Sequence, residues 1–253
     1  MRHLLFGAVV SALSLSGTGL AQAPAPRFEA ASIKRNTTDD FVPGSPRFAG
    51  ETFTARQMPV ATIISTAYGI PTRELVDGPD WIYSTSTERF DVVAKAAPGS
   101  SRADMQAMLR HTLEDRFKLR LRRERREMPV YLLTRIDPAG SLGPNLRRPT
   151  KDCSPKCTGS VGAAGARGEG MDWALVLQSI TNAIPDRRVI DQTGLTGTFD
   201  FELAYRRGLS ADPNDPQADI FTAVRQQLGL KLEPGRMPFD VGVIERVERP
   251  TPD

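Results

Sequence analysis

The sequence predicts an α+β protein of two tandem pseudo-repeats, each a small, mostly antiparallel sheet with two helices on one face. Stretches in which apolar and polar residues alternate, as in half-buried strands, are interspersed with stretches of helical period. The order of these signals recurs at a spacing of roughly 110 residues. With 253 residues and 40% hydrophobic content, the chain can form one large or two small domains, and the sequence leaves open whether the copies share one core.

The first copy is expected within residues 24–136. Pro59 suits the first position of a helix that ends before Gly69, and a second helix is expected over residues 102–116. Alternation and flanking turn residues place strands at residues 27–34, 51–56, 75–76, 90–94, 118–125 and 128–134. The last two strands are expected to pair with each other as a hairpin.

Residues 137–170 are rich in Gly, Pro, Ser, Ala and Arg and lack a helical or strand period, which predicts a Gly-rich linker. The second copy is expected within residues 171–253. It begins with a helix from the candidate N-cap Asp172 to Ala183. The remaining elements are expected to be a helix at residues 220–228 and strands at residues 188–191, 199–205, 231–233 and 238–247.

Five pairs of short strings carry the repeat. Similar residues stand in the same order in both copies, at offsets of 109 to 114 positions. The pairs are Met58-Pro59-Val60-Ala61 with Met171-Asp172-Trp173-Ala174, Leu75-Val76-Asp77 with Val189-Ile190-Asp191, Phe90-Asp91-Val92 with Phe199-Asp200-Phe201, Phe117-Lys118-Leu119 with Leu230-Lys231-Leu232, and Met128-Pro129-Val130 with Met237-Pro238-Phe239. This agreement in order and offset indicates a duplicated unit.

Residues 1–23 have the features of a signal peptide. A basic start precedes an apolar run from Leu4 to Leu15, and small residues allow a cut after Ala21 or Ala23. The apolar run is too short to cross a bilayer core of about 30 Å; the alternative is a buried N-terminal helix. We therefore expect a periplasmic or secreted protein that does not span the membrane after signal cleavage.

Composition excludes several classes of partner and cofactor. Loss of Arg2 leaves 32 Lys and Arg against 30 Asp and Glu, a balance that does not suggest a nucleic-acid binder. With two Cys and two His in the whole chain, neither a Cys/His metal site nor a cofactor is expected. In an oxidising compartment, Cys153 and Cys157 are expected to close a small disulfide loop, with a redox dithiol as the alternative.

Several strings resemble a family of uncharacterised secreted proteins that is expanded in soil bacteria, acidobacteria among them. They are residues 28–34, Gly78-Pro79-Asp80-Trp81, Arg89-Phe90-Asp91, residues 115–119 and, most specifically, Asp191-Gln192-Thr193-Gly194-Leu195-Thr196-Gly197. The resemblance covers essentially the whole mature chain and implies an exported protein of unassigned function. Some relatives are attached to antibiotic-sensor-type membrane metallopeptidases, and no catalytic residues are established for the family. By fold analogy alone, the element order also resembles the small N-terminal modules of secretins and TonB-dependent receptors, which bind proteins.

Carboxylates are the only catalytic candidates, because the metalloprotease, nucleophile-elbow and phosphate-loop motifs are absent from the sequence. Asp77, Asp80 and Asp191 stand beside turns, where paired acids can perform acid/base chemistry. An Asp next to Gly or Thr also caps turns through its own hydrogen bonds. Recurrence of such positions in both copies favours this structural role.

The candidate binding residues fall into two groups. In the run from Arg116 to Arg126, Arg120 and Arg122 alternate with apolar residues, and Arg123 follows, so one strand face is expected to be cationic. Such a face is either solvated or a patch for an anionic surface. The second group comprises Trp81, Thr193 and Thr196 of the turn strings, and Trp81 is also a candidate core anchor.

These observations favour an exported, non-enzymatic binding module of the cell envelope whose partner is an envelope protein or an anionic envelope component. One alternative is an envelope hydrolase that uses carboxylates near the turn strings. A second alternative is binding of an anionic envelope surface through the basic strand.

Overall fold

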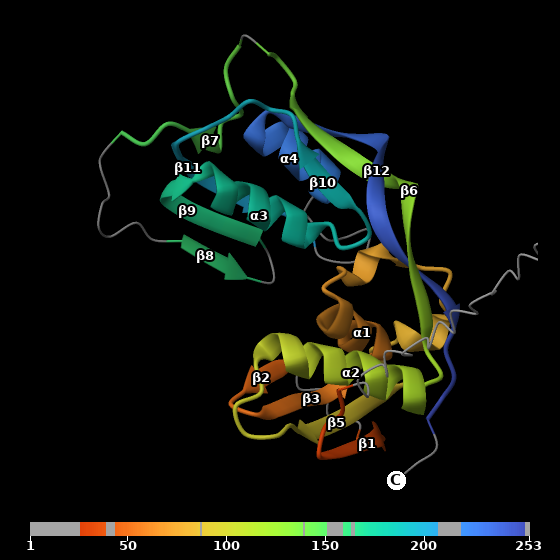
Figure 1. Ribbon diagram of the computed structural model, residues 1–253. Coiled ribbons are helices and arrows are strands. Elements are labelled where there is room, and N and C mark those ends of the chain that lie inside the picture. The colour runs from red at the N-terminus through yellow and green to blue at the C-terminus, as the bar shows by residue number, and fades with distance from the viewer. Residues whose placement is uncertain are drawn as a thin grey trace, which may run out of the picture.

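The computed structural model describes residues 26–38, 44–86, 88–138, 140–150, 159–162, 165–206 and 219–250. These residues form an α+β fold with four α-helices and three four-stranded, mostly antiparallel sheets. Two lobes, each a sheet with helices, are joined by a long two-stranded ribbon (Figure 1). The predicted signal peptide, residues 1–23, and the cysteine pair Cys153 and Cys157 lie outside the described residues.

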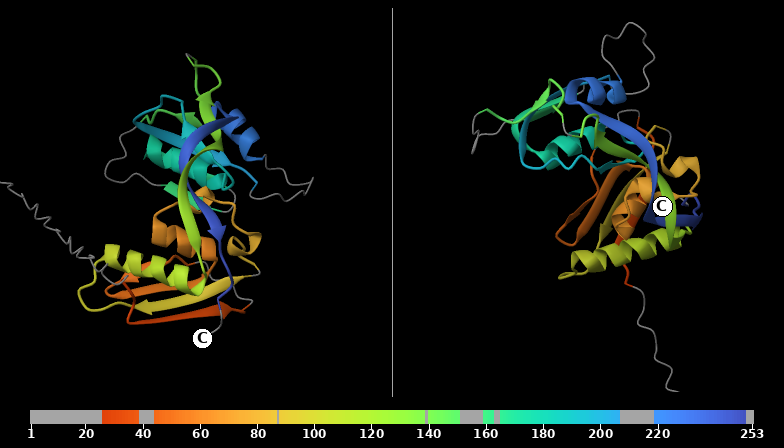
Figure 2. Two further views of the ribbon diagram at one scale, coloured as in Figure 1. Left: turned by 45° about the vertical axis from the view of Figure 1, so that its right-hand side comes forward. Right: turned by 90° about the horizontal axis from the view of Figure 1, so that it is seen from above.

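Lobe 1 contains an antiparallel sheet in the order β1-β5-β3-β2. Its elements are β1 (Ala30–Asn36), β2 (Arg47–Ala49), β3 (Thr52–Met58), β5 (Arg89–Lys95), α1 (Val60–Tyr68) and α2 (Arg102–Arg116), with the 3-10 helices η1 (Thr72–Glu74) and η2 (Asp80–Ile82). Both α-helices lie on one side of the sheet, as two further views show (Figure 2). Helix α2 begins at a capping box in which the Asp104 N–H donates to Ser101 Oγ at 3.1 Å.

Lobe 2 contains an antiparallel sheet in the order β7-β11-β9-β8. Its elements are β7 (Leu146–Arg147), β8 (Gly159–Gly162), β9 (Gly165–Asp172), β11 (Thr198–Ala204), α3 (Trp173–Ala183) and α4 (Ile220–Leu228). The Asp219 carboxylate caps α4, accepting the N–H groups of Phe221 at 2.9 Å and Thr222 at 3.0 Å. The helix ends at Gly229, whose φ of 68° is the left-handed conformation that glycine adopts readily.

The third sheet joins the lobes and has the order β10-β6-β12-β4. Its strands are β4 (Leu75–Val76), β6 (Arg120–Arg135), β10 (Arg188–Asp191) and β12 (Leu230–Arg246). β6 and β12 run antiparallel from the Arg135–Leu230 pair to the Arg120–Arg246 pair. The short strands pair in parallel with the long strand of the other half of the chain, β4 with β12 and β10 with β6.

The predicted hairpin between residues 118–125 and 128–134 is wrong. Both segments belong to one strand, β6, whose partner is β12 from the other half of the chain. Likewise, residues 231–233 and 238–247 lie along the single strand β12. The two residues between the first pair of segments, Arg126 and Glu127, include none of the Gly, Asn or Asp that a tight hairpin turn needs, so the strand continues.

The expected absence of strands from residues 137–170 is also wrong, because this segment contains β7, β8 and most of β9. The buried positions of β9 are Ala166, Gly168 and Gly170, while Arg167 and Glu169 point outward. A strand whose inward residues are Gly and Ala shows no apolar alternation in its sequence. The domain boundaries at 136/137 and 170/171 stay predictions.

Each lobe has its own hydrophobic core, and the ribbon supplies side chains to both. Ile244 is buried in the core of lobe 1, with Leu121 packed against it. Leu133 and Leu230 are buried in the core of lobe 2. The apolar residues of one end of the ribbon therefore hold lobe 1, and those of the other end hold lobe 2.

At the waist between the lobes, the register places Met128 directly opposite Met237. Nearby, the Glu74 carboxylate of η1 forms an ion pair with Arg188 at the start of β10. Glu74 is only 7% exposed, and the Arg188 guanidinium lies 4.8 Å from the centre of the Phe239 ring. This ion pair links lobe 1 to lobe 2 beside the ribbon.

Replacement of Arg188 by Ala is expected to lower the free energy of unfolding by about 1–3 kcal/mol, because it leaves the buried Glu74 without its cation. Urea denaturation measures this change. The matched control is Arg246→Ala, which removes the exposed pair with Glu248 and should cost about 1 kcal/mol or less. Equal losses for the two variants would contradict a stabilising role for the waist pair.

Candidate functional site

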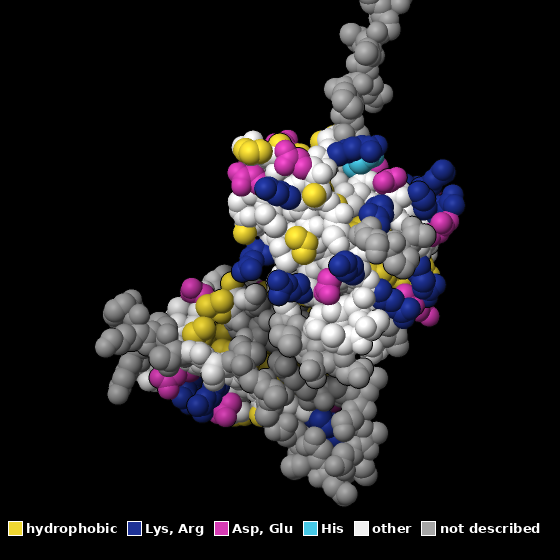
Figure 3. All heavy atoms as spheres, turned by 90° about the horizontal axis from the view of Figure 1, so that it is seen from below, with side chains coloured by type: hydrophobic (Ala, Val, Ile, Leu, Met, Phe, Trp, Pro, Cys, Tyr) yellow, Lys and Arg dark blue, Asp and Glu magenta, His cyan; other side chains and the backbone are white. Residues whose placement is uncertain are grey.

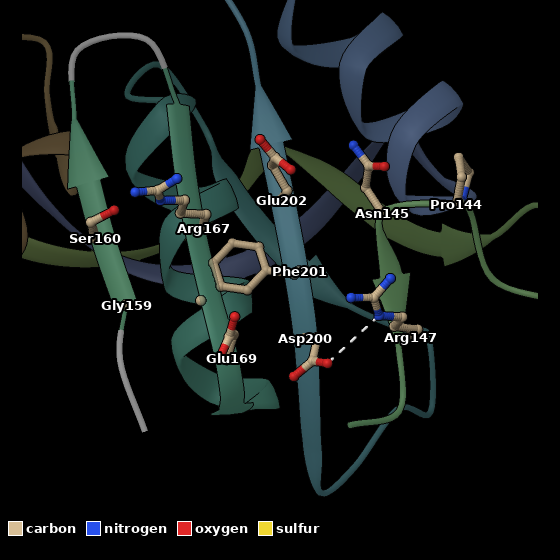
Figure 4. Close-up of a pocket in the computed structure, with 11 residues that line it drawn as sticks. Pro144, Asn145, Arg147, Gly159, Ser160, Arg167, Glu169, Asp200, Phe201 and Glu202 are labelled. Atoms are coloured by element: carbon tan, nitrogen blue, oxygen red, sulfur yellow. Dashed lines mark ion pairs between the residues drawn. The ribbon is translucent and has the colours of Figure 1, made fainter. Parts of the chain in front are cut away.

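A groove crosses the open face of the lobe 2 sheet, the face that α3 and α4 do not cover (Figure 4). Its volume is about 510 Å³. All four strands of the sheet, or the residues next to them, contribute to its lining. The lining comprises Pro144, Asn145, Arg147, Gly159, Ser160, Arg167, Gly168, Glu169, Asp200, Phe201 and Glu202.

The charges in the groove are ordered by the strand register. Asp200 of β11 stands opposite Arg147 of β7, and the two form an ion pair at 3.6 Å. One step along the same face of the sheet, Glu202 stands opposite Arg167 of β9. Because side chains on one face of neighbouring strands lie about 5 Å apart, these residues form two adjacent rows of opposite charges. Phe201, which is buried in the core of lobe 2, also borders the groove.

Lobe 1 has the same strand register on its open face but different side chains. Lys34 stands opposite Asp91 there, as Arg147 stands opposite Asp200 in lobe 2. The position that corresponds to the Arg167–Glu202 pair is held by Thr54 and Val93. The row that carries opposite charges in lobe 2 is thus uncharged in lobe 1.

A family model described as "Protein of unknown function (DUF3738)" matches residues 61–247, which is most of the chain and includes the groove. The chain belongs to the DUF3738 family. No curated protein and no solved structure matches it. The family description assigns no reaction or ligand, so the role of the DUF3738 chain has to be argued from its own residues.

The Asp191 carboxylate of the DUF3738 chain accepts hydrogen bonds from residues of its own turn and of the nearby helix α3. Its carboxylate accepts the indole N–H of Trp173 at 2.6 Å, and the N–H and hydroxyl of Thr193 at 2.9 and 2.7 Å. The Thr193 hydroxyl in turn accepts the N–H of Leu195 at 3.1 Å, and Thr193 is buried. Thr196 is exposed, and its carbonyl accepts a hydrogen bond from Arg148 at 2.6 Å.

Asp77 and Asp80 lie in lobe 1, far from Asp191. Asp77 follows β4, and its exposed carboxylate forms an ion pair with Arg126 of β6 at 3.0 Å. β4 ends beside Arg122 through β12, whereas Asp191 pairs with Leu133, eleven residues further along β6. At about 3.3 Å per residue, roughly 35 Å of strand separates the two positions. The three candidate acids therefore do not form one site.

The basic run lies on the lobe 1 end of the ribbon, with Arg120, Arg122 and Arg123 all exposed. Part of its charge is paired with neighbouring carboxylates. Arg122 pairs with Glu124 at 2.5 Å and with Glu245 at 2.9 Å, while Arg123 donates to the Tyr68 carbonyl at 2.9 Å. On the face of the molecule seen from below, Lys and Arg lie interspersed with Asp and Glu (Figure 3).

Trp81 is half-buried against the lobe 1 core, and Arg249 lies over its ring at 4.8 Å. Arg249 also donates to both oxygens of Glu88, from Nε at 3.1 and 3.0 Å. Glu88 is 8% exposed, and the hydrogen bonds from Arg249 lower the pKa of its carboxyl. The Arg249 side chain thus fixes the end of the described chain to lobe 1 and covers one face of the indole.

The site residues predicted from the sequence do not include the groove residues Arg147, Arg167, Glu169 and Glu202. The available signal was the alternation of charged residues with small or apolar ones at positions 167–170 and 199–203. Among the described residues, no group of three or more His, Cys, Asp or Glu is arranged to hold a metal ion. Within the same part of the chain, no helix is both long and apolar enough to cross a membrane.

Replacement of Arg249 by Gln is expected to destabilise lobe 1 at neutral pH and to have a smaller effect in acid. Because the folded-state pKa of Glu88 lies below its ordinary value of about 4.5, the ion pair contributes stability above that pH. The contribution is lost as the pH falls through the lowered pKa, so the difference between variant and wild type should shrink below about pH 4.5.

Urea denaturation at pH 7, 4 and 3, followed by tryptophan fluorescence, measures this effect. Arg246→Gln is the control, because its partner Glu248 is exposed. A difference for Arg249→Gln that stays constant over this pH range would contradict the assignment.

Proposed function

We propose that the chain is an exported, non-enzymatic binding module of the cell envelope and that the open face of the lobe 2 sheet binds an envelope protein. The observation that carries this proposal is the charged groove. It has a volume of about 510 Å³, within the range of ordinary ligand sites. The matching face of lobe 1 has Thr54 and Val93 where the groove has Arg167 and Glu202.

We also infer that the two lobes descend from one duplicated unit. In each half of the chain, three strands are followed by a helix, a short strand, a strand, a helix and a long strand, in that order. The sheet orders β1-β5-β3-β2 and β7-β11-β9-β8 correspond strand by strand. Asp91 accepts the N–H of Gln57 at 2.7 Å, and Asp200 accepts the N–H of Gly170 at 2.9 Å, at matching positions of positive φ.

The duplication separates structural residues from functional ones. A residue needed for the fold is expected to make the same contact in both lobes, as Asp91 and Asp200 do. A residue selected for binding is free to differ between them. The row of Arg167 and Glu202 belongs to the second kind, which supports lobe 2 as the binding lobe.

The alternatives receive less support from the geometry. A hydrolase that uses Asp77, Asp80 and Asp191 needs acids that converge, but roughly 35 Å of strand separates the positions of Asp77 and Asp191 along the ribbon. Asp191 is also occupied by local donors. Binding of an anionic surface through the basic strand needs a surplus of positive charge, but Glu124 and Glu245 offset the charge of Arg122.

Capture of partners from an envelope extract tests the binding surface. Immobilised residues 24–253 should retain an envelope protein, and the variant Arg167→Gln/Glu202→Gln should lose most of it. The matched control, Arg56→Gln/Glu29→Gln, removes one exposed charge of each sign from lobe 1 and should retain the protein. Retention by the groove variant equal to that of wild type would refute the lobe 2 surface as the binding site.

Export is tested by expressing the full chain in a Gram-negative host and fractionating the cells. The protein is expected in the periplasm or the medium, with a mature N-terminus at Gln22 or Pro24, as N-terminal sequencing would show. A full-length protein confined to the cytoplasm would contradict export. Replacement of Leu5 and Val9 by Arg is the control, because charges in the apolar run should block export.

A further inference from the structure

We infer that the lobe 2 groove binds the zwitterionic backbone of a short peptide, with the peptide carboxylate at Arg167 and its ammonium at Glu202. The inference rests on the proposed function, because it takes the open face of lobe 2 as the binding surface. It adds a short peptide as a second, small ligand of the same surface.

The Arg167 and Glu202 side chains do not pair with each other. Arg167 and Glu202 stand directly opposite each other on neighbouring strands, and both are exposed. Opposite charges in this position commonly form a cross-strand pair. Here neither side chain forms an ion pair or hydrogen bond with any other described residue, and Figure 4 shows the Arg167 guanidinium directed toward β8, away from Glu202.

The other charged side chains of the groove already have interaction partners. Asp200 accepts the Gly170 N–H at 2.9 Å and pairs with Arg147 at 3.6 Å. Glu169 has a partner of its own. One cation and one anion, on neighbouring strands, therefore remain for a ligand.

This arrangement discriminates against ligands of a single charge. A simple anion at Arg167 would leave the Glu202 carboxylate without a partner, and a simple cation at Glu202 would leave the Arg167 guanidinium without one. A molecule with one group of each sign satisfies both side chains. Phe201, Gly159 and Gly168 also belong to the lining between these charged side chains.

The probe is trialanine with both ends free. Two blocked forms serve as matched ligands: N-acetyl-trialanine, which lacks the ammonium, and trialanine amide, which lacks the carboxylate. Isothermal titration against residues 24–253 should give an affinity for free trialanine at least about tenfold above that for either blocked form. Equal affinity for all three peptides, or no binding of free trialanine, would overturn the assignment of the ligand class.

Single variants assign each charge to its group. Arg167→Gln should bind free trialanine and trialanine amide equally, because the carboxylate has lost its partner. Glu202→Gln should bind free trialanine and N-acetyl-trialanine equally. Arg56→Gln on lobe 1 should keep the full preference, and thermal melting should confirm that all three variants are folded. A preference that survives both groove substitutions would overturn the inference.

The two proposals fail in different ways. If capture of an envelope protein depends on Arg167 and Glu202 but free trialanine does not bind, the ligand class is wrong and the binding surface stands. If capture is indifferent to both residues, the proposed function is wrong, whatever trialanine does.

Discussion

The pairing of β6 with β12 is the interaction on which the rest of the structure depends. The two strands come from different halves of the chain, and their opposite ends supply Ile244 to the core of lobe 1 and Leu133 and Leu230 to the core of lobe 2. The short strands strengthen this dependence, because β4 and β10 each pair with the long strand of the other half. Neither half of the chain therefore completes its strand hydrogen bonding without the other.

At the waist of the ribbon, the joining sheet consists of only two of the described strands, β6 and β12. Pro129 and Pro238 lie near its middle, where β6 and β12 pair only with each other. Proline has no N–H to donate, which discourages a third strand from joining at these positions. The lobes are instead held by the Glu74–Arg188 ion pair and the stacking of Arg188 on Phe239. This leaves the open face of the lobe 2 sheet clear of lobe 1.

Comparison of the two lobes distinguishes residues that make the same structural contact in both from residues that differ between them. Asp91 and Asp200 make the same contact to a backbone of positive φ, so they serve the fold. Asp191 likewise organises a turn through Trp173 and Thr193. Arg167 and Glu202, which differ from the residues at the matching positions of lobe 1, make no such turn contact and line the groove.

The sequence by itself determined the four helices, including the ends of two of them before Gly69 and Gly229, because helical period and glycine stops are encoded within a few residues. It also predicts that one unit occurs twice, and this duplication stays a proposal. Only the tertiary structure decided that β6 pairs with β12 rather than folding back on itself, and that Gly-rich segments form β8 and β9. Strand partners are chosen by burial and hydrogen bonding across more than a hundred residues of chain. For the same reason the groove, whose charges come from β7, β9 and β11, exists only after the chain has folded.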